Sequence, residues 1–103
     1  MKLSIKHRIS TSSLLPQTGG ILEQMTSRDI LKKVEILAEE AKEVNLRPEG
    51  EMIIWDQDKD SGKEVEFSPT EIIFLKDQVE KRDKEKKITP DILDICLLIK
   101  EQK

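Results

Sequence analysis

The chain has 103 residues, of which 36% are hydrophobic and 38% are charged, and its formal net charge at pH 7 is −3. This length predicts a single domain, residues 1–103, whose one modest core is aliphatic because only 3% of the residues are aromatic. The acidic balance argues against a dedicated nucleic-acid-binding module. The single cysteine excludes an internal disulfide and favours an intracellular site. No apolar run approaches the length of a membrane span.

The first predicted elements are a short strand and a helix. Alternating polar and apolar residues allow a strand at residues 2–5, and apolar residues then fall near one helical face over residues 5–15. A serine and threonine cluster at residues 10–13 weakens helix propensity, so the type of this second element stays open. Pro16 and Gly19-Gly20 end it in either case.

The next segment shows a clearer helical pattern. Thr26 or Ser27 is a suitable cap, Asn45 is a suitable terminator, and Pro48 blocks continuation. Between them, apolar residues repeat at spacings of three and four, which predicts an amphipathic helix. These residues are Ile30, Val34, Leu37, Ala41 and Val44. A break near Leu37-Ala38 into two helices is an alternative, because the acidic residues that follow suit a first turn.

A β-hairpin is predicted in the middle of the chain, with arms at about residues 51–56 and 63–67. The turn Asp60-Ser61-Gly62 suits a three-residue loop in which glycine takes the left-handed conformation. Closing this loop places Trp55 opposite Phe67, so that Ile53, Trp55, Val65 and Phe67 share a face and Met52 and Ile54 lie on the other. A slip of one residue exchanges these faces, and the sequence leaves both registers open.

The first arm of this hairpin is the main candidate for a binding surface. Its four residues, Met52, Ile53, Ile54 and Trp55, are all apolar, whereas a hairpin in a small protein normally has one polar face. The arm is therefore either covered on both sides or exposed for contact with a partner. Tryptophan is enriched at interface hot spots, and an exposed apolar patch marks a contact site.

Two helices are predicted after the hairpin. Ser68-Pro69-Thr70-Glu71 is a capping box with proline at the first helical position, and Thr89-Pro90-Asp91 begins the last helix in a similar way. The complete prediction is an α+β domain that is mainly helical, with two or three helices, a central β-hairpin and two C-terminal helices.

The overall pattern resembles a group of short proteins encoded by tailed phages and prophages. The matching features are Leu14-Leu15-Pro16 with Gly19, Glu39-Glu40-Ala41-Lys42-Glu43, Glu49-Gly50, Trp55 at the end of a strand, an acidic lysine-containing turn, Glu71 at the opening of a helix, and Lys86-Lys87-Ile88-Thr89-Pro90. The resemblance implies a phage-encoded protein that acts in the host cytoplasm or in a virion. It implies no catalytic or binding residues.

The sequence offers little material for metal binding or catalysis. Asp56, Asp58 and Asp60 alternate as in a calcium loop, but Ser61 and Phe67 occupy the positions where such a loop needs glycine and a bidentate glutamate. The single histidine, His7, and Cys96 are far apart in sequence, and Cys96 lies on an apolar helical stripe. We therefore expect no metal site, no cofactor and no enzymatic activity.

A winged-helix protein that contacts nucleic acid is the main alternative. The helix that follows Arg28 would read the nucleic acid, and the hairpin would be the wing, but three aspartates at the wing tip would be repelled by phosphates. Lys2, Lys6 and Arg8 form only a small basic end.

The function predicted from the sequence is that of a non-enzymatic phage protein-interaction module. It would bind a host factor as an inhibitor or modulator, or another phage protein, or a second copy of itself. A minor structural protein of the virion is a further alternative, and a membrane location is not expected.

Overall fold

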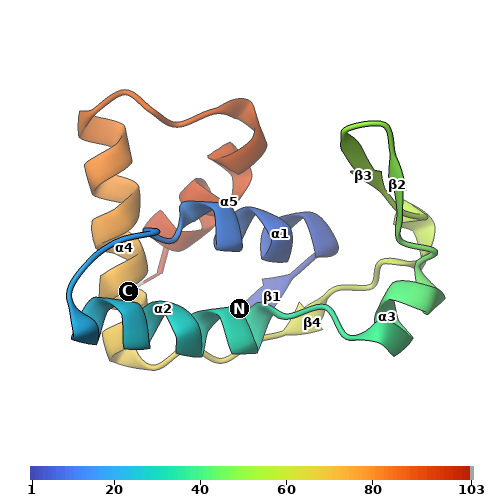
Figure 1. The fold of residues 1–103 in the computed structure, drawn as a ribbon, viewed down its shortest axis with the longest axis horizontal. Coiled ribbons are helices and arrows are strands. Elements are labelled where there is room, and N and C mark those ends of the chain that lie inside the picture. The colour runs from blue at the N-terminus through green and yellow to red at the C-terminus, as the bar shows by residue number, and fades with distance from the viewer. Residues whose placement is uncertain (103) are drawn as a thin grey trace.

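The computed structural model describes residues 1–102 (Figure 1). It confirms the predicted α+β class, in which helices predominate and short strand pairs lie between the N-terminal helices and the two C-terminal helices. In chain order the elements are β1 (Lys2–Leu3), α1 (Ile5–Leu14), α2 (Ile21–Val34), α3 (Ala38–Glu43), β2 (Arg47–Glu49), β3 (Met52–Ile54), the 3-10 turn η1 (Gln57–Lys59), β4 (Lys63–Glu64), α4 (Pro69–Lys84) and α5 (Pro90–Lys100).

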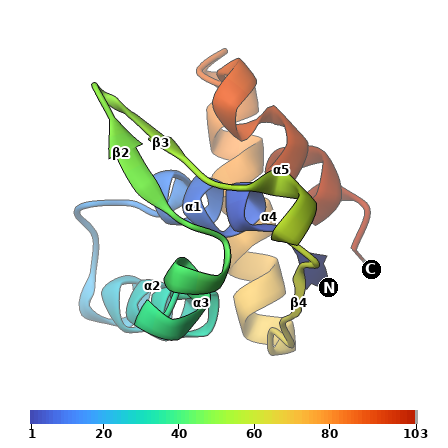
Figure 2. The same ribbon diagram turned by 90° about the vertical axis from the view of Figure 1, so that its right-hand side faces the viewer.

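Helix α1 is the central element, and it packs against α2, α4 and α5 (Figures 1 and 2). Most of the buried apolar residues form one cluster around it, to which every one of these helices contributes. The cluster contains Leu3, Leu14, Leu15, Ile30, Val34, Val65, Leu75, Val79, Ile92, Ile95, Cys96 and Ile99. Removing aliphatic surface from water is the main force that holds these helices together.

The serine and threonine residues of α1 are compatible with the helix because their hydroxyl groups find local acceptors. Thr11 Oγ1 donates to the carbonyl oxygen of His7 at 2.7 Å, and Ser12 Oγ donates to that of Ile9 at 2.7 Å. Ser10 Oγ instead donates to the carbonyl oxygen of Asp91 at 3.0 Å, which ties α1 to the start of α5. The weak helix propensity of this cluster is therefore outweighed by packing and by these hydrogen bonds.

Helix α2 begins at Ile21, six residues earlier than a cap at Thr26 would place it. Gly20 is the N-cap, and its N–H donates to Oε1 of Glu23 at 3.3 Å, so the glutamate half of a capping box is present without a capping hydroxyl. The predicted start at Thr26 or Ser27 is therefore wrong. Ser27 instead lies in the helix and is buried.

The single helix predicted over Ile30 to Val44 is wrong, and the alternative of a break near Leu37-Ala38 is confirmed. Helix α2 ends at Val34, α3 begins at Ala38, and Leu37 is 58% exposed, so the apolar stripe does not run continuously to Val44. Asn45 ends α3 as predicted, with φ of 55° in the left-handed region. The N–H of Leu46 donates to the carbonyl oxygen of Ala41 at 2.8 Å, which is the bond pattern of a Schellman motif.

The predicted pairing of residues 51–56 with 63–67 is wrong, because β3 pairs with the segment before it. Strands β2 and β3 are antiparallel, with Glu49 opposite Met52 and Arg47 opposite Ile54. Gly50, with φ of 63°, begins the two-residue loop, as in a type II′ turn. This short loop closes with less loss of chain entropy than the longer turn through residues 57–62.

The segment after η1 pairs with the N-terminus instead. Lys63 lies opposite Leu3 and Glu64 opposite Lys2, and the N–H of Val65 donates to the carbonyl oxygen of Met1 at 2.8 Å. Val65 is therefore buried in the core, and Phe67 packs against it. The predicted face of Ile53, Trp55, Val65 and Phe67 does not form.

The C-terminal helices begin at the predicted positions. Ser68 Oγ accepts from the N–H of Glu71 at 3.2 Å, and Glu71 Oε1 accepts from the N–H of Ser68 at 2.7 Å, which completes the capping box of α4. Helix α5 starts at Pro90 after Thr89. None of the helices over residues 1–102 is long and apolar enough to cross a membrane.

Replacing Lys86 by glycine should stabilise the protein. Lys86 has φ of 56° at the C-terminal end of α4, a conformation that is strained for a residue with a Cβ and free of strain for glycine. We expect Lys86→Gly to raise the free energy of unfolding by about 0.5–1 kcal/mol. Lys84→Gly, inside the last turn of the same helix, should lower it by about 1 kcal/mol. Urea unfolding measures both, and equal signs would contradict the assignment of the helix end.

Candidate functional site

The apolar arm predicted as the contact surface is strand β3 and the residue after it. Met52 is 69% exposed and Ile53 is 51% exposed, while Ile54 and Trp55 are half-buried. The three residues of the partner strand β2 are all exposed. Figure 2 shows the β2–β3 hairpin lying across the body of the molecule in front of α1, with α3 at its base.

A groove of about 350 Å³ lies between the hairpin and the helices beneath it. The hairpin contributes Glu51, Met52, Ile53 and Trp55, α1 contributes Lys6, Ile9, Ser10 and Ser13, and α5 contributes Asp91 and Ile92. All the hairpin residues in this set come from β3 and its flanks rather than from β2. The groove therefore follows the β3 side of the hairpin, where Figure 2 shows β3 nearer to α5 than β2 is.

Trp55 brings an unusual polar group to this groove. Its indole Nε1 is buried and has no hydrogen-bond partner among residues 1–102. A buried donor without an acceptor costs about 1–3 kcal/mol, so this tryptophan is held in place at the expense of stability. Arg8 Nε and Ser27 Oγ are also buried without a partner, so such groups are not confined to the groove.

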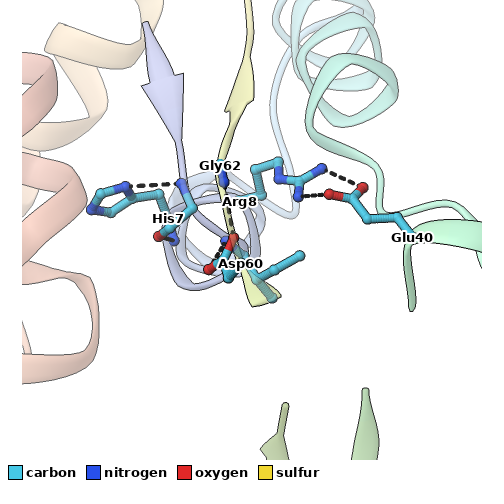
Figure 3. Close-up of polar contacts among 7 residues, drawn as sticks. His7, Arg8, Glu40, Asp60 and Gly62 are labelled. Atoms are coloured by element: carbon cyan, nitrogen blue, oxygen red, sulfur yellow. Dashed lines mark hydrogen bonds and ion pairs between the residues drawn. The ribbon is translucent and has the colours of Figure 1, made fainter. Parts of the chain in front are cut away.

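The base of the hairpin is fixed by an ion pair between α1 and α3. Arg8 is 1% exposed, and its two terminal nitrogens bind both carboxylate oxygens of Glu40, with 2.8 Å between Nη1 and Oε1 (Figure 3). Bidentate pairing of this kind is strong and directional. Because α3 leads into β2 through Asn45, the pair sets where the hairpin begins.

Asp60 fixes the C-terminal end of the hairpin segment, which runs from β2 through β3 and η1 to residue 60. Its Oδ2 accepts from the N–H of Ile5 at 3.0 Å, and its Oδ1 accepts from the N–H of Gly62 at 3.3 Å (Figure 3). Asp60 thus binds the first turn of α1, whose positive end favours a carboxylate. Ser4 and His7 complete this helix start, because Nδ1 of His7 accepts from the N–H of Ser4 at 3.3 Å.

Two of the three aspartates that alternate in the turn after Trp55 have structural partners. Asp56 lies 3.6 Å from Nη1 of Arg47 and 3.7 Å from Nζ of Lys59, and Asp60 binds α1 as described above. No group of three metal-ligating side chains is assembled within the described part of the chain.

Two glutamates near the core have lowered pKa values. The hydrogen bonds from Arg8 lower the pKa of Glu40 and outweigh the opposing effect of burial. Burial alone would raise the pKa of Glu71, but hydrogen bonds from Lys33 and from the Ser68 backbone together lower it. Both carboxylates therefore stabilise the fold in their ionised form.

The two residues weighed as a nucleophile and its base contribute to structure. Cys96 is buried in the core, and burial raises the pKa of its thiol. His7 uses Nδ1 in the start of α1. Neither residue lines the groove, whose polar groups offer hydrogen bonding and charge to a ligand.

Part of this site was beyond sequence reasoning. The apolar arm was found from its four consecutive apolar residues, but nothing in the sequence pointed to α1 and α5 as the opposite wall. The sequence predicts Arg8 as part of a small basic group at the N-terminal end of the chain, whereas the structure buries it against Glu40. The acid was 32 residues away in the sequence, so no local pattern linked the pair.

Comparisons of the chain with protein-family models, curated proteins and solved structures found no match.

Removing the charge of Glu40 should destabilise the protein far more than the same change at a surface glutamate. Glu40→Gln leaves Arg8 buried with an unpaired charge, which should lower the free energy of unfolding by about 3 kcal/mol. Glu80→Gln is the matched control, because the side chains of Glu80 and its ion-pair partner Lys84 are 63% and 75% exposed, respectively. It should change stability by less than about 0.5 kcal/mol. Equal effects in urea unfolding would contradict the buried pair.

Stability should fall in acid because of Glu40 and Glu71. Their pKa values in the folded protein lie below the ordinary value of 4.5. At pH values between the folded and unfolded pKa, the unfolded chain therefore binds more protons than the folded protein does. Their contribution is present above pH 4.5 and is lost as the pH falls through the folded values. Glu71→Gln keeps a side chain that can cap the helix but removes the charge. The urea midpoint of unfolding of this variant should therefore fall less than that of the wild type between about pH 6 and pH 2. Parallel profiles would contradict this assignment.

Proposed function

We propose that this protein is a non-enzymatic protein-interaction module that binds a partner polypeptide through β3 and the groove beside it. In keeping with the resemblance to short phage proteins, the partner would be a host factor or another phage protein, and binding would occlude or scaffold it.

The observation that carries this proposal is the exposure of apolar side chains beside a groove. Met52 and Ile53 are more than half exposed, although the chain has few apolar residues for its core. Their exposure is maintained by the Arg8–Glu40 pair and by Asp60, which hold both ends of the hairpin segment. Exposed apolar surface held in place beside a hollow is typical of a protein contact site.

The other exposed apolar residues make weaker candidates. Ile21 and Leu22 are 82% and 78% exposed at the start of α2, but neither lines the groove beside β3. Leu31 is 42% exposed and lines a separate hollow between α1 and α2, which no tryptophan lines. Ile73 is 62% exposed on α4, away from the groove. The hairpin is the place where exposed apolar groups, a tryptophan and a hollow coincide.

The charge of the hairpin region favours a protein over a nucleic acid. Glu49, Glu51, Asp56, Asp58 and Asp60 lie in or near the hairpin, against Arg47 and Lys59. Phosphates would be repelled by this surface. The hairpin of residues 51–67 that would have served as a wing is not formed.

The proposal is tested by comparing two exposed isoleucines. Tagged wild-type protein and the variants Ile53→Ser and Ile73→Ser are incubated with extract from bacteria, with and without phage infection, and bound proteins are identified by mass spectrometry. We expect a partner that is retained by the wild type and by Ile73→Ser and is lost at least tenfold with Ile53→Ser. Both variants should remain folded, because both side chains are more than half exposed.

Two results would contradict the proposal. One is a partner that is retained equally by both variants, which would place the contact surface elsewhere. The other is retention of nucleic acid alone, with an affinity that falls steeply as salt is raised.

A further inference from the structure

We infer that the partner binds as an extended segment that adds a strand to the outer edge of β3, and that this segment carries basic side chains among apolar ones. This inference rests on the proposed function, because it names the form and chemistry of the partner at the same groove.

The first step is the hydrogen-bonding direction of β3. In an antiparallel pair, opposite residues alternate between a hydrogen-bonded pair and a non-hydrogen-bonded pair whose main-chain groups point outward. Ile53 lies opposite Pro48, which has no N–H to donate. Their pair is therefore the non-hydrogen-bonded one, and the N–H and C=O of Ile53 point away from β2.

The second step is that the outward groups of β3 remain free. Within residues 1–102, neither Ile53 nor Trp55 makes a main-chain hydrogen bond to another element or to a side chain. On the opposite edge of the hairpin, Pro48 removes the corresponding donor, which is a common protection against strand addition. The two edges therefore differ, and the edge of β3 is the one able to accept a strand.

The third step is that the groove lies along this same edge. Its hairpin residues come from β3 and its flanks, and its other wall is formed by residues of α1 and α5. Side chains of an added strand would alternate between the groove and solvent. Those that point inward would meet Ile9, Ile53 and Ile92, which favours apolar residues at alternate positions. This is the arrangement by which β-strand addition gains affinity from the main chain and specificity from side-chain pockets.

The fourth step is the charge of the groove. Lys6 is paired with Asp94 at 3.1 Å, whereas Glu51 and Asp91 form no ion pair among residues 1–102. The groove therefore presents two unpaired carboxylates, and Glu49 adds a third charge at the hairpin tip. A basic segment complements this surface. A second copy of the chain would bring its own acidic hairpin to the same edge, so charge disfavours self-association here.

The test begins with selection of peptides from a random display library on the immobilised full-length protein. Selected peptides are synthesised, and their binding to ¹⁵N-labelled protein is followed by NMR. We expect peptides with alternating apolar and basic residues that shift the amide signals of Met52 to Asp56 and protect the Ile53 amide from hydrogen exchange. Glu51→Gln together with Asp91→Asn should weaken their binding at least tenfold, and raised salt should remove this difference.

Backbone methylation of the peptide separates strand addition from simple apolar contact. In an added strand, alternate peptide N–H groups point toward β3, so N-methylation at one set of alternate positions should abolish binding and at the other set should leave it within about threefold. Proteins that bind only through side chains would not show this alternation.

The outcomes distinguish the inference from the proposed function. Peptides that depend on Ile53 but are helical, acidic or indifferent to the phase of methylation would overturn strand addition and leave the hairpin as a contact surface. Peptides that bind elsewhere and ignore Ile53→Ser would overturn both. Concentration-dependent dimerisation in sedimentation experiments, lost with Ile53→Ser, would make a second copy the occupant and would also overturn the inference.

Discussion

The buried charge of Arg8 is the constraint on which the arrangement of this protein depends. A guanidinium group that is 1% exposed requires a partner, and Glu40 on α3 is that partner. The ion pair between Arg8 and Glu40 holds α3 beside α1, although α3 contributes no buried residue of its own. Because β2 follows α3 after a tight Schellman turn, the ion pair positions the hairpin together with the buried Val44, whose carbonyl oxygen accepts from the N–H of Asp56 at 2.7 Å. Asp60 fixes the return of the chain to α1 in the same manner.

This division of roles explains how a small core supports an exposed arm. The helices α1, α2, α4 and α5 contribute most of the apolar cluster, together with Leu3, Leu15 and Val65, and no residue of β2 or β3 belongs to it. Displacing the hairpin would therefore remove few buried apolar contacts from the core. Its Met52 and Ile53 are available to a ligand without any unfolding of the helices.

The parts of the fold that were predictable from the sequence are those specified by neighbouring residues. The capping box at Ser68 and Glu71 and the terminator Asn45 act within one helical turn, and both are confirmed. The predicted hairpin pairing is wrong because β3 has a glycine-containing turn on each side and can pair through either one. The local sequence pattern also does not reveal that Lys63 and Glu64 pair with the N-terminal strand β1. The groove shared this limit, because its walls come from three segments that only the tertiary fold brings together.

The pairing of β1 with β4 has a consequence for the order in which the chain folds. Lys2 lies opposite Glu64, the first turn of α1 is capped by Asp60, and α1 packs on α5, which begins at Pro90. The distant partners of the N-terminal helix are therefore made late during synthesis, and a nascent chain would carry α1 with its local Ser4–His7 cap but without the contacts of Asp60 and α5 until those segments have emerged. Contacts between such distant residues slow folding, so these elements should become structured together rather than progressively along the chain.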